Sequence, residues 1–194
     1  MNPVARGHRC SVRLPAHDYG GPGAYFITVV AQGGEAVFGN IAGDGVLVAE
    51  EAGRIVRATW EGLERRFTGL TLDAFVLMPN HIHGVVVIEP ACRGAVSAPS
   101  PRQGAPSSGI EAAAPPTGVS LARVVAYLKY QSTKSINAAR GTPGLRVWQR
   151  NYYEHVVRND EELNRIREYI MTNPPRWALD RENPAFRSRG ARHG

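Results

Sequence analysis

Hydrophobic residues occur along the chain either in short continuous runs, typical of strands, or at the spacing of amphipathic helices. Together these patterns predict the order of the elements. Residues 24–31 are apolar almost throughout and rich in β-branched and aromatic side chains, which predicts a central strand. A short second strand is predicted at 46–48. Apolar runs at 72–78 and 85–88 predict two further strands, and the Pro-Asn pair after the first of them predicts a bend. The pair Val156-Val157 predicts the end of a last strand.

Three segments have the spacing of amphipathic helices. The helix predicted at 50–67 has its apolar stripe at Ala52, Val56, Trp60, Leu63 and Phe67. A second helix is predicted at 120–138, with Ser120 as its N-cap and Gly141 as its stop. A third is predicted at 161–172 and ends before Pro174, because the residue preceding a proline resists the α region.

This order of strands and helices is typical of an α+β sandwich with helices packed on one face of an antiparallel sheet. We expect one domain over residues 23–180, preceded by a basic arm at 1–22 and followed by a basic tail at 181–194. Residues 91–117 are rich in Ala, Pro, Gly and Ser, with almost no large apolar side chains. Such a composition cannot offset the entropy of ordering, so we expect a mobile insertion that is dispensable for chemistry.

The net charge indicates the class of partner, and the cysteine content indicates the cellular compartment. The net charge of +6 and the pI near 9.7 favour a polyanionic partner, with nucleic acid first. Cys10 and Cys92 are too few and too far apart for a disulfide framework or a zinc knuckle, which suits a reducing cytoplasm. The sequence contains no apolar run long enough for a membrane span. We therefore expect a cytoplasmic protein with no membrane association.

His81 and His83 are the first candidate site residues. Side chains alternate faces along a strand, so two histidines separated by Ile82 point the same way. Two neighbouring imidazoles form half of a divalent-metal site. A bare His-x-His also arises by accident, so the pattern needs a third ligand and a reacting group.

Two residues on the last predicted helix could supply these groups: Tyr169 the reacting group and Asn173 the third ligand. Their i, i+4 spacing places them on one helical face, one turn apart. If this helix docks across the histidine strand, two imidazoles and an amide oxygen could hold Mg²⁺ or Mn²⁺ beside a phenol. Such an ion would assist phosphodiester cleavage by the tyrosine. Tyr130, Tyr152 and Tyr153 are rival tyrosines, but the adjacent pair look more like alternating strand residues or base-stacking groups, and Tyr130 has no ligand-like partner at i+4.

Candidate DNA contacts are basic and aromatic. Arg13 lies in the N-terminal arm, and Lys129 and Lys134 are positioned on the second long helix to face solvent or a phosphate backbone. The remaining candidates lie in a loop rich in stacking and phosphate-binding side chains and are Trp148, Arg150 and Tyr152.

Five motifs, in order along the chain, carry a resemblance to a known family. They are GAYFIT at 23–28, MPNHIHG at 78–84, VWQR at 147–150, EH at 154–155 and REYIMTNP at 167–174. Together they resemble the REP-associated tyrosine transposases, in the single-tyrosine branch of the HUH endonuclease superfamily. The resemblance runs from about residue 13 to 180, apart from the insertion. The insertion is longer than expected for the family, and the motif at 154–155 has no assigned role.

The resemblance implies a ferredoxin-like fold and a metal-dependent enzyme that nicks and rejoins single-stranded or hairpin DNA through a 5′-phosphotyrosine. By position, His81 and His83 match the paired metal ligands, Tyr169 the nucleophile and Asn173 the later polar ligand. It also implies a nucleoid-associated location and favours a monomer over a helix-swapped homodimer. Two alternatives stay open: a domesticated hairpin-binding protein that has lost cleavage, and a metal-dependent hydrolase of a small substrate.

Overall fold

A four-stranded antiparallel sheet organises the part of the chain that this computed structural model describes, residues 21–90, 119–179 and 183. Its strands, in the order β4-β5-β1-β6, are β4 (Leu70–Leu77), β5 (His81–Ile88), β1 (Gly23–Val30) and β6 (Tyr153–Val157). Strands β1 and β5 lie in the centre and pair along their whole length. A separate hairpin consists of β2 (Gly39–Ile41) and β3 (Leu47–Ala49). The predicted α+β class with an antiparallel sheet is confirmed.

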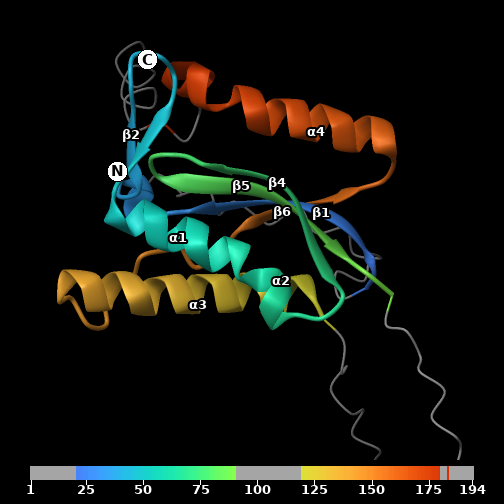
Figure 1. The fold of residues 1–194 in the computed structure, drawn as a ribbon, viewed down its shortest axis with the longest axis horizontal. Helices are drawn as coiled ribbons and strands as arrows, with labels where there is room; N and C mark the ends of the chain where they lie inside the picture. The colour runs from blue at the N-terminus through green and yellow to red at the C-terminus, as the bar shows by residue number, and fades with distance from the viewer. Residues whose placement is uncertain (1–20, 91–118, 180–182, 184–194) are drawn as a thin grey trace, which may run out of the picture.

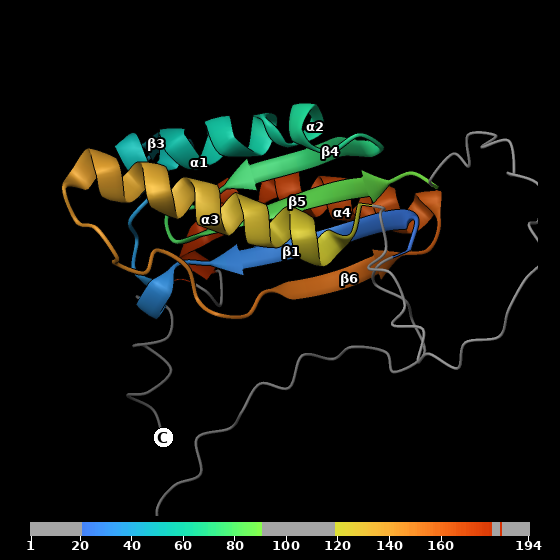
Figure 2. The same cartoon turned by 90° about the horizontal axis from the view of Figure 1, so that it is seen from below.

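The helices form two layers around this sheet. Helices α1 (Glu51–Glu61), α2 (Leu63–Arg66) and α3 (Leu121–Arg140) lie on one face, and α4 (Asp160–Thr172) lies across the other (Figures 1 and 2). Two short 3₁₀ segments are η1 (Gln32–Gly34) and η2 (Pro174–Leu179). The expectation of a single covered face therefore holds for three helices and not for α4. Both faces of β5 carry buried side chains, Val86 on one and Val85 on the other, so each face needs a cover.

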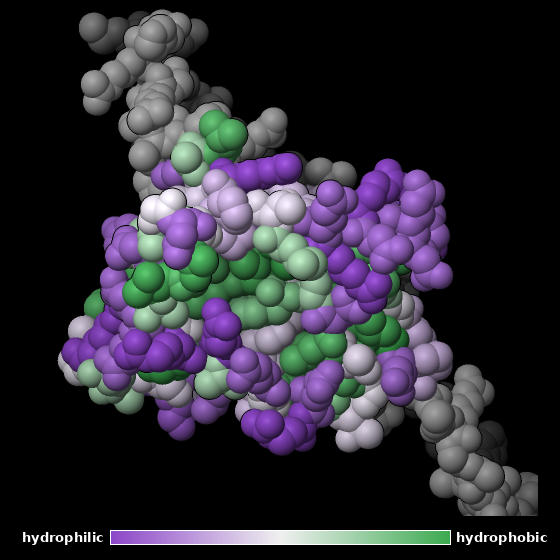
Figure 3. Space-filling model, turned by 45° about the horizontal axis from the view of Figure 1, so that its top comes forward, coloured by the Kyte–Doolittle hydropathy of each residue, from purple (hydrophilic) through white to green (hydrophobic). Residues whose placement is uncertain are grey.

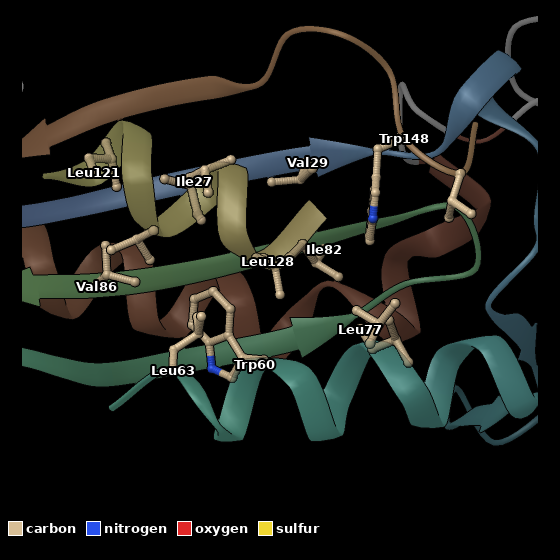
Figure 4. Packing of buried hydrophobic residues seen from close by; sticks show 14 of the residues in the cluster. Ile27, Val29, Trp60, Leu63, Leu77, Ile82, Val86, Leu121, Leu128 and Trp148 are labelled. Carbon is tan, nitrogen blue, oxygen red and sulfur yellow. The ribbon is translucent and has the colours of Figure 1, made fainter. Parts of the chain in front are cut away.

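The hydrophobic core lies between the sheet and the layer formed by α1 and α3. Figure 4 shows its packing, with side chains from both central strands directed toward the helices; ten of its members are Ile27, Val29, Trp60, Leu63, Leu77, Ile82, Val86, Leu121, Leu128 and Trp148. One glycine is required here. A Cβ at Gly84 would collide with the indole ring of Trp60, so the absence of a side chain lets α1 approach β5 just after the two histidines.

Local signals explain most element boundaries. The predicted helix at 50–67 is divided at Gly62, whose backbone N–H closes the end of α1. Ser120 caps α3 by accepting a hydrogen bond from the backbone N–H of Arg123, and Gly141, at φ 63°, ends the helix in the left-handed region. Asn159 caps α4 in the same way through the N–H of Glu162. The predicted cap and stop of α3 are confirmed.

Several predicted segments lie outside the described residues. They are the arm at 1–22 apart from its last two residues, all of the insertion at 91–117, and the tail at 181–194 apart from Asn183. Within the described residues, no helix is both long enough and apolar enough to cross a membrane.

Candidate metal and tyrosine site

His81 and His83 open β5 and point to the same face of the sheet, the face that α4 covers. Their side chains are buried, and their Nε2 atoms lie 2.9 Å apart. The rings are nearly perpendicular, with centroids 4.5 Å apart. The intervening Ile82 faces the core on the other side of the sheet. Strand alternation therefore brings the two imidazoles together as the sequence predicts.

Each imidazole is oriented by a second residue through its Nδ1 atom. The Nδ2 of Asn80 donates to the backbone oxygen of Gly34 at 2.8 Å, which turns the Asn80 Oδ1 toward His81 at 2.7 Å from Nδ1. Since an amide oxygen only accepts, the Nδ1–H of His81 donates to it, and the Nε2 of His81 keeps its lone pair. The Nδ1 of His83 is hydrogen-bonded with the Thr28 hydroxyl at 2.8 Å. Outer contacts of this kind fix metal-binding histidines in other proteins.

Burial keeps both imidazoles neutral. Desolvation lowers the pKa of His83 to about 3. The pKa of His81 is also well below its usual value, first because of desolvation and then because of the neighbouring His83. Neutral imidazole is also the form that binds a metal ion.

Tyr169 reaches this pair from α4. Its hydroxyl lies 3.3 Å from the Nε2 of His83, and the two rings are 5.2 Å apart between centroids. The side chain is 46% exposed, so a large substrate can approach the phenol from solvent. The docking on which the sequence argument depended is present: α4 lies across the strand that carries both histidines (Figure 1).

Asn173 follows Tyr169 by one helical turn and is buried. Its Nδ2 is enclosed and has no hydrogen-bond partner among the described atoms. The chain contacts the histidines on both sides of this residue, because Tyr169 touches His83 and the ring of Trp177 lies 5.9 Å from that of His81. Asn173 therefore lies in the chain between two residues that each contact one of the histidines.

Two polar contacts fasten α4 to the sheet. Arg167 binds Asp73 of β4 through both carboxylate oxygens, at 2.8 and 2.6 Å. Near the start of the helix, the Nε2–H of His155 donates to Glu162 at 2.8 Å. His155 thus has a positioning role that the sequence left unassigned, whereas its neighbour Glu154 is buried on the opposite face of the sheet.

The donor set fits a divalent cation. Two nitrogens that each lie about 2.1 Å from one ion, at roughly a right angle, are about 3 Å apart, close to the separation of 2.9 Å between the Nε2 atoms. Within the described part of the chain, no group of three or more His, Cys, Asp and Glu side chains could hold a metal ion. Among the described residues, a third protein ligand would therefore have to come from another residue type, and the Asn173 amide oxygen is a hard donor of the kind that Mg²⁺ and Mn²⁺ accept.

Three of the predicted DNA contacts have structural roles instead. Trp148 is buried, packs on Phe38 and donates from Nε1 to the Ser132 hydroxyl at 2.9 Å. The Lys129 amine donates to the backbone oxygens of residues 149–151, and burial lowers its pKa to about 8. Tyr152 is half-buried against the core with that amine 5.5 Å from its ring centroid. These side chains hold the loop before β6 on α3 and do not form a free stacking surface.

The other predicted contacts are distributed over the molecule. Lys134 is exposed on α3, on the opposite side of the sheet from Tyr169. Arg150 is exposed in the loop before β6. Arg13 lies outside the described residues. Among the described residues, Lys134 therefore lies away from the tyrosine site.

Sequence reasoning missed the residues that surround the imidazoles. Thr28 and Asn80 orient the two rings, and Phe26 stacks on His83 with its centroid 5.5 Å away. All three lie within motifs singled out in the sequence, but their roles depend on the strand register: Thr28 is directly opposite His83 in the β1–β5 pair. Tyr153, which the sequence favours as a strand residue or a base-stacking group over a nucleophile, lies in contact with Phe26.

Comparison with known proteins agrees with the fold described above. No family model matches the sequence. The solved structure of a REP-associated tyrosine transposase bound to a REP hairpin superimposes with a TM-score of 0.54 at 15% identity, covering 87% of this chain and 76% of that one. A candidate transposase from Deinococcus radiodurans gives a TM-score of 0.39 at 17% identity, over 82% of this chain and 95% of that one. The likeness to the first of these structures shows a transposase-like α+β fold.

A sequence relative defines the family more narrowly. An uncharacterized protein of Haemophilus influenzae (strain KW20 / Rd) is 33% identical over 175 residues, which cover 89% of this chain and 92% of that protein. The chain belongs to the same family as this Haemophilus protein.

Proposed function

We propose that the protein is a metal-dependent tyrosine transposase of the HUH type, which nicks and rejoins single-stranded or hairpin DNA. The observation that carries the proposal is the convergence of three atoms. The Tyr169 hydroxyl lies 3.3 Å from the Nε2 of His83, which in turn lies 2.9 Å from the Nε2 of His81. Titratable groups with strongly shifted pKa values beside a partly exposed phenol mark a candidate functional site, and the transposase-like fold supports the same function.

In the proposed reaction the Tyr169 oxygen attacks the phosphorus of a DNA phosphodiester. A phosphorus–oxygen bond to tyrosine forms, the bond to the 3′ oxygen of the preceding nucleotide breaks, and a 5′-phosphotyrosine and a free 3′-hydroxyl result. The phenol proton passes to water, to which the half-exposed side chain has access, and the departing 3′ oxygen takes up a proton from water. Attack by a 3′-hydroxyl reverses the step, so strands are exchanged without an external energy source.

The other residues bind and orient. His81, His83 and Asn173 would hold Mg²⁺ or Mn²⁺. A bound ion of this kind neutralises a non-bridging phosphate oxygen and favours in-line attack. Thr28 and Asn80 hold the imidazole rings in place. Arg167 and His155 hold α4, and with it Tyr169, over the sheet.

The DNA partner follows from charge and from the fold. The net charge of +6 favours a polyanion. The structural relative was solved with a REP hairpin, and we propose that this chain also acts on hairpin DNA with single-stranded flanks. Hairpin tips and single strands expose the base faces that a duplex hides.

The decisive experiment is covalent trapping. A REP hairpin oligonucleotide labelled at its 3′ end and incubated with the protein and Mn²⁺ should yield a labelled protein band that survives denaturing electrophoresis. The same oligonucleotide labelled at its 5′ end should release a labelled fragment instead, because only the downstream strand stays on tyrosine. A chelator should abolish both products.

Two variants define the nucleophile. Tyr169→Phe should form no adduct, whereas Tyr130→Phe should behave like the wild type, because Tyr130 is 66% exposed on α3 and distant from the histidines. An adduct that persists in Tyr169→Phe contradicts the assignment. Hairpin binding without any cleavage by the wild type would favour a domesticated hairpin-binding protein.

A further inference from the structure

An aromatic surface continues outward from the imidazole pair. Phe26 lies at its centre, with ring centroids 5.5 Å from His83, 6.1 Å from Tyr169 and 6.3 Å from Tyr153. The ring of Phe26 is nearly parallel to that of His83, at 24°, and steeply inclined to both tyrosines. The proposed reaction uses His83 and Tyr169 but assigns nothing to Phe26 or Tyr153.

The strand order directs this surface toward the edge of the sheet. His83 lies on β5, Phe26 on the neighbouring β1, and Tyr153 on β6, which is the edge strand. The register places both His83 and Tyr153 opposite Thr28. Because side chains opposite each other on adjacent strands share a face, the three rings form a continuous row from the imidazole pair to solvent.

Helix α4 leaves the outer part of this row open. Tyr153 is 54% exposed, and Phe26 is only partly buried. The hydrophobic core lies on the other side of the sheet, so the Tyr153 ring adds little to folding. Figure 3 views the molecule from the side of α4 and of β4, the edge strand opposite β6, and shows a band of hydrophobic residues bordered by hydrophilic ones there. Exposed aromatic rings gathered at one place mark a binding site more often than scattered ones do.

The ligand that fits these rings is a nucleobase. Aromatic side chains bind single-stranded nucleic acid by stacking on the base faces, and a phosphate held near Tyr169 would bring the adjoining base within reach of the row. The net charge of +6 suits a polyanion better than an apolar peptide or a second copy of this chain. A paired base has both faces covered, so the base must be unpaired.

We propose that Phe26 and Tyr153 form a stacking site, the aromatic platform, for one unpaired nucleobase next to the phosphate that Tyr169 attacks. This inference rests on the proposed function. It assigns a reason for the exposure of Tyr153, and it requires the DNA to be unpaired on the side of the phosphate that faces β6.

The test measures stacking directly, with Tyr169→Phe protein so that binding is not followed by cleavage. The probe is a REP hairpin oligonucleotide in which 2-aminopurine replaces single bases of the flanks in turn, because its fluorescence falls on stacking. One flank position should be quenched on binding. Adding Tyr153→Leu should restore its fluorescence and weaken binding about tenfold, within the range of one lost base–aromatic stack.

Matched variants separate stacking from folding. Tyr153→Trp should keep both the quenching and the affinity, because an aromatic face remains. Tyr130→Leu, which removes another exposed tyrosine from the far side of the sheet, should change neither. Thermal unfolding of Tyr153→Leu should match that of the parent, since the ring is mostly exposed. Phe26→Leu should reduce quenching in the same way as Tyr153→Leu.

Either of two results would overturn the platform: quenching and affinity unchanged in both leucine variants, or equal quenching when the flank is annealed to a complementary strand. The covalent trapping experiment reports on the proposed function separately. If adducts form but quenching does not depend on Phe26 and Tyr153, the transposase chemistry is supported and the stacking site is excluded. Platform-dependent quenching without adducts keeps the stacking site in a protein that binds DNA and does not cleave it.

Discussion

Arg167 binds both carboxylate oxygens of Asp73, and this fork joins α4 to β4 two residues before Tyr169. The contact matters because α4 has little apolar anchorage: Ile170 is its one buried residue. The position of the proposed nucleophile therefore depends on polar contacts to an unusual degree.

Removal of the Arg167–Asp73 ion pair should affect the reaction more than the stability of the fold. In Arg167→Ala we expect adduct formation to slow by about tenfold or more, because small displacements of a reacting group are costly. The free energy of unfolding should fall only modestly, since the pair is partly exposed. Arg165→Ala is the matched control: Arg165 pairs with Glu161 on the outer side of the same helix and is 70% exposed. Equal rates in the two variants would contradict a positioning role for Arg167.

The same pair should give the fold a measurable acid dependence. Hydrogen bonds from Arg167 hold the pKa of Asp73 below its usual value, about 3.9. A carboxylate with a lowered pKa stabilises the folded state at higher pH, and this stabilisation is lost as the pH falls through the lowered pKa. In urea unfolding, the wild type should exceed Asp73→Asn in stability at pH 7, and the difference should disappear as the pH falls below about 4. A difference that stays constant with pH would exclude an electrostatic origin.

The tautomer of His81 depends on Asn80. In Asn80→Ala the His81 ring loses the acceptor that fixes its Nδ1–H, and we expect Mn²⁺ to bind about 10- to 100-fold more weakly. Calorimetric titration with Mn²⁺ measures the change without any DNA. Asn151→Ala, an exposed asparagine outside the site, should bind as the wild type does. Equal affinities in the two variants would show that the His81 tautomer does not limit metal binding.

Gly84 sets the spacing between β5 and α1. Gly84→Ala should lower the free energy of unfolding by about 1–3 kcal/mol, because the added methyl collides with the Trp60 ring. Combining it with Trp60→Leu should cost less than the sum of the two single changes, since the smaller side chain makes room. Additive costs, measured by urea unfolding, would mean that the collision is relieved by another route.

Periodicity alone predicted most of the fold. The apolar run at 24–31 became β1, and the helical stripe at 161–172 became α4, each within one residue of the predicted start. The shared face of His81 and His83, and the docking of Tyr169 against them, followed from strand and helix spacing together with the family resemblance. These features depend on short stretches of sequence, in which the spacing of residues along a strand or helix determines the face on which each side chain lies.

What the sequence did not predict depends on contacts between distant segments. Tyr152 and Tyr153 are adjacent and chemically alike, but alternation sends one toward α3 and the other toward Phe26. The face of each could not be assigned before the register of β6 on β1 was known. In the same way, Trp148 reads as an exposed stacking residue until Phe38 and Ser132 enclose it.

The division of the site between β5 and α4 has a consequence for the growing polypeptide. All four strands of the sheet precede α4 in the chain, so a nascent protein can form its sheet and its imidazole pair before Tyr169 has been synthesised. A chain truncated before residue 160 would keep the histidines and lack the phenol. Under the proposed function, incomplete products of translation would be unable to nick DNA, and the activity would begin only when the final helix folds back over the sheet.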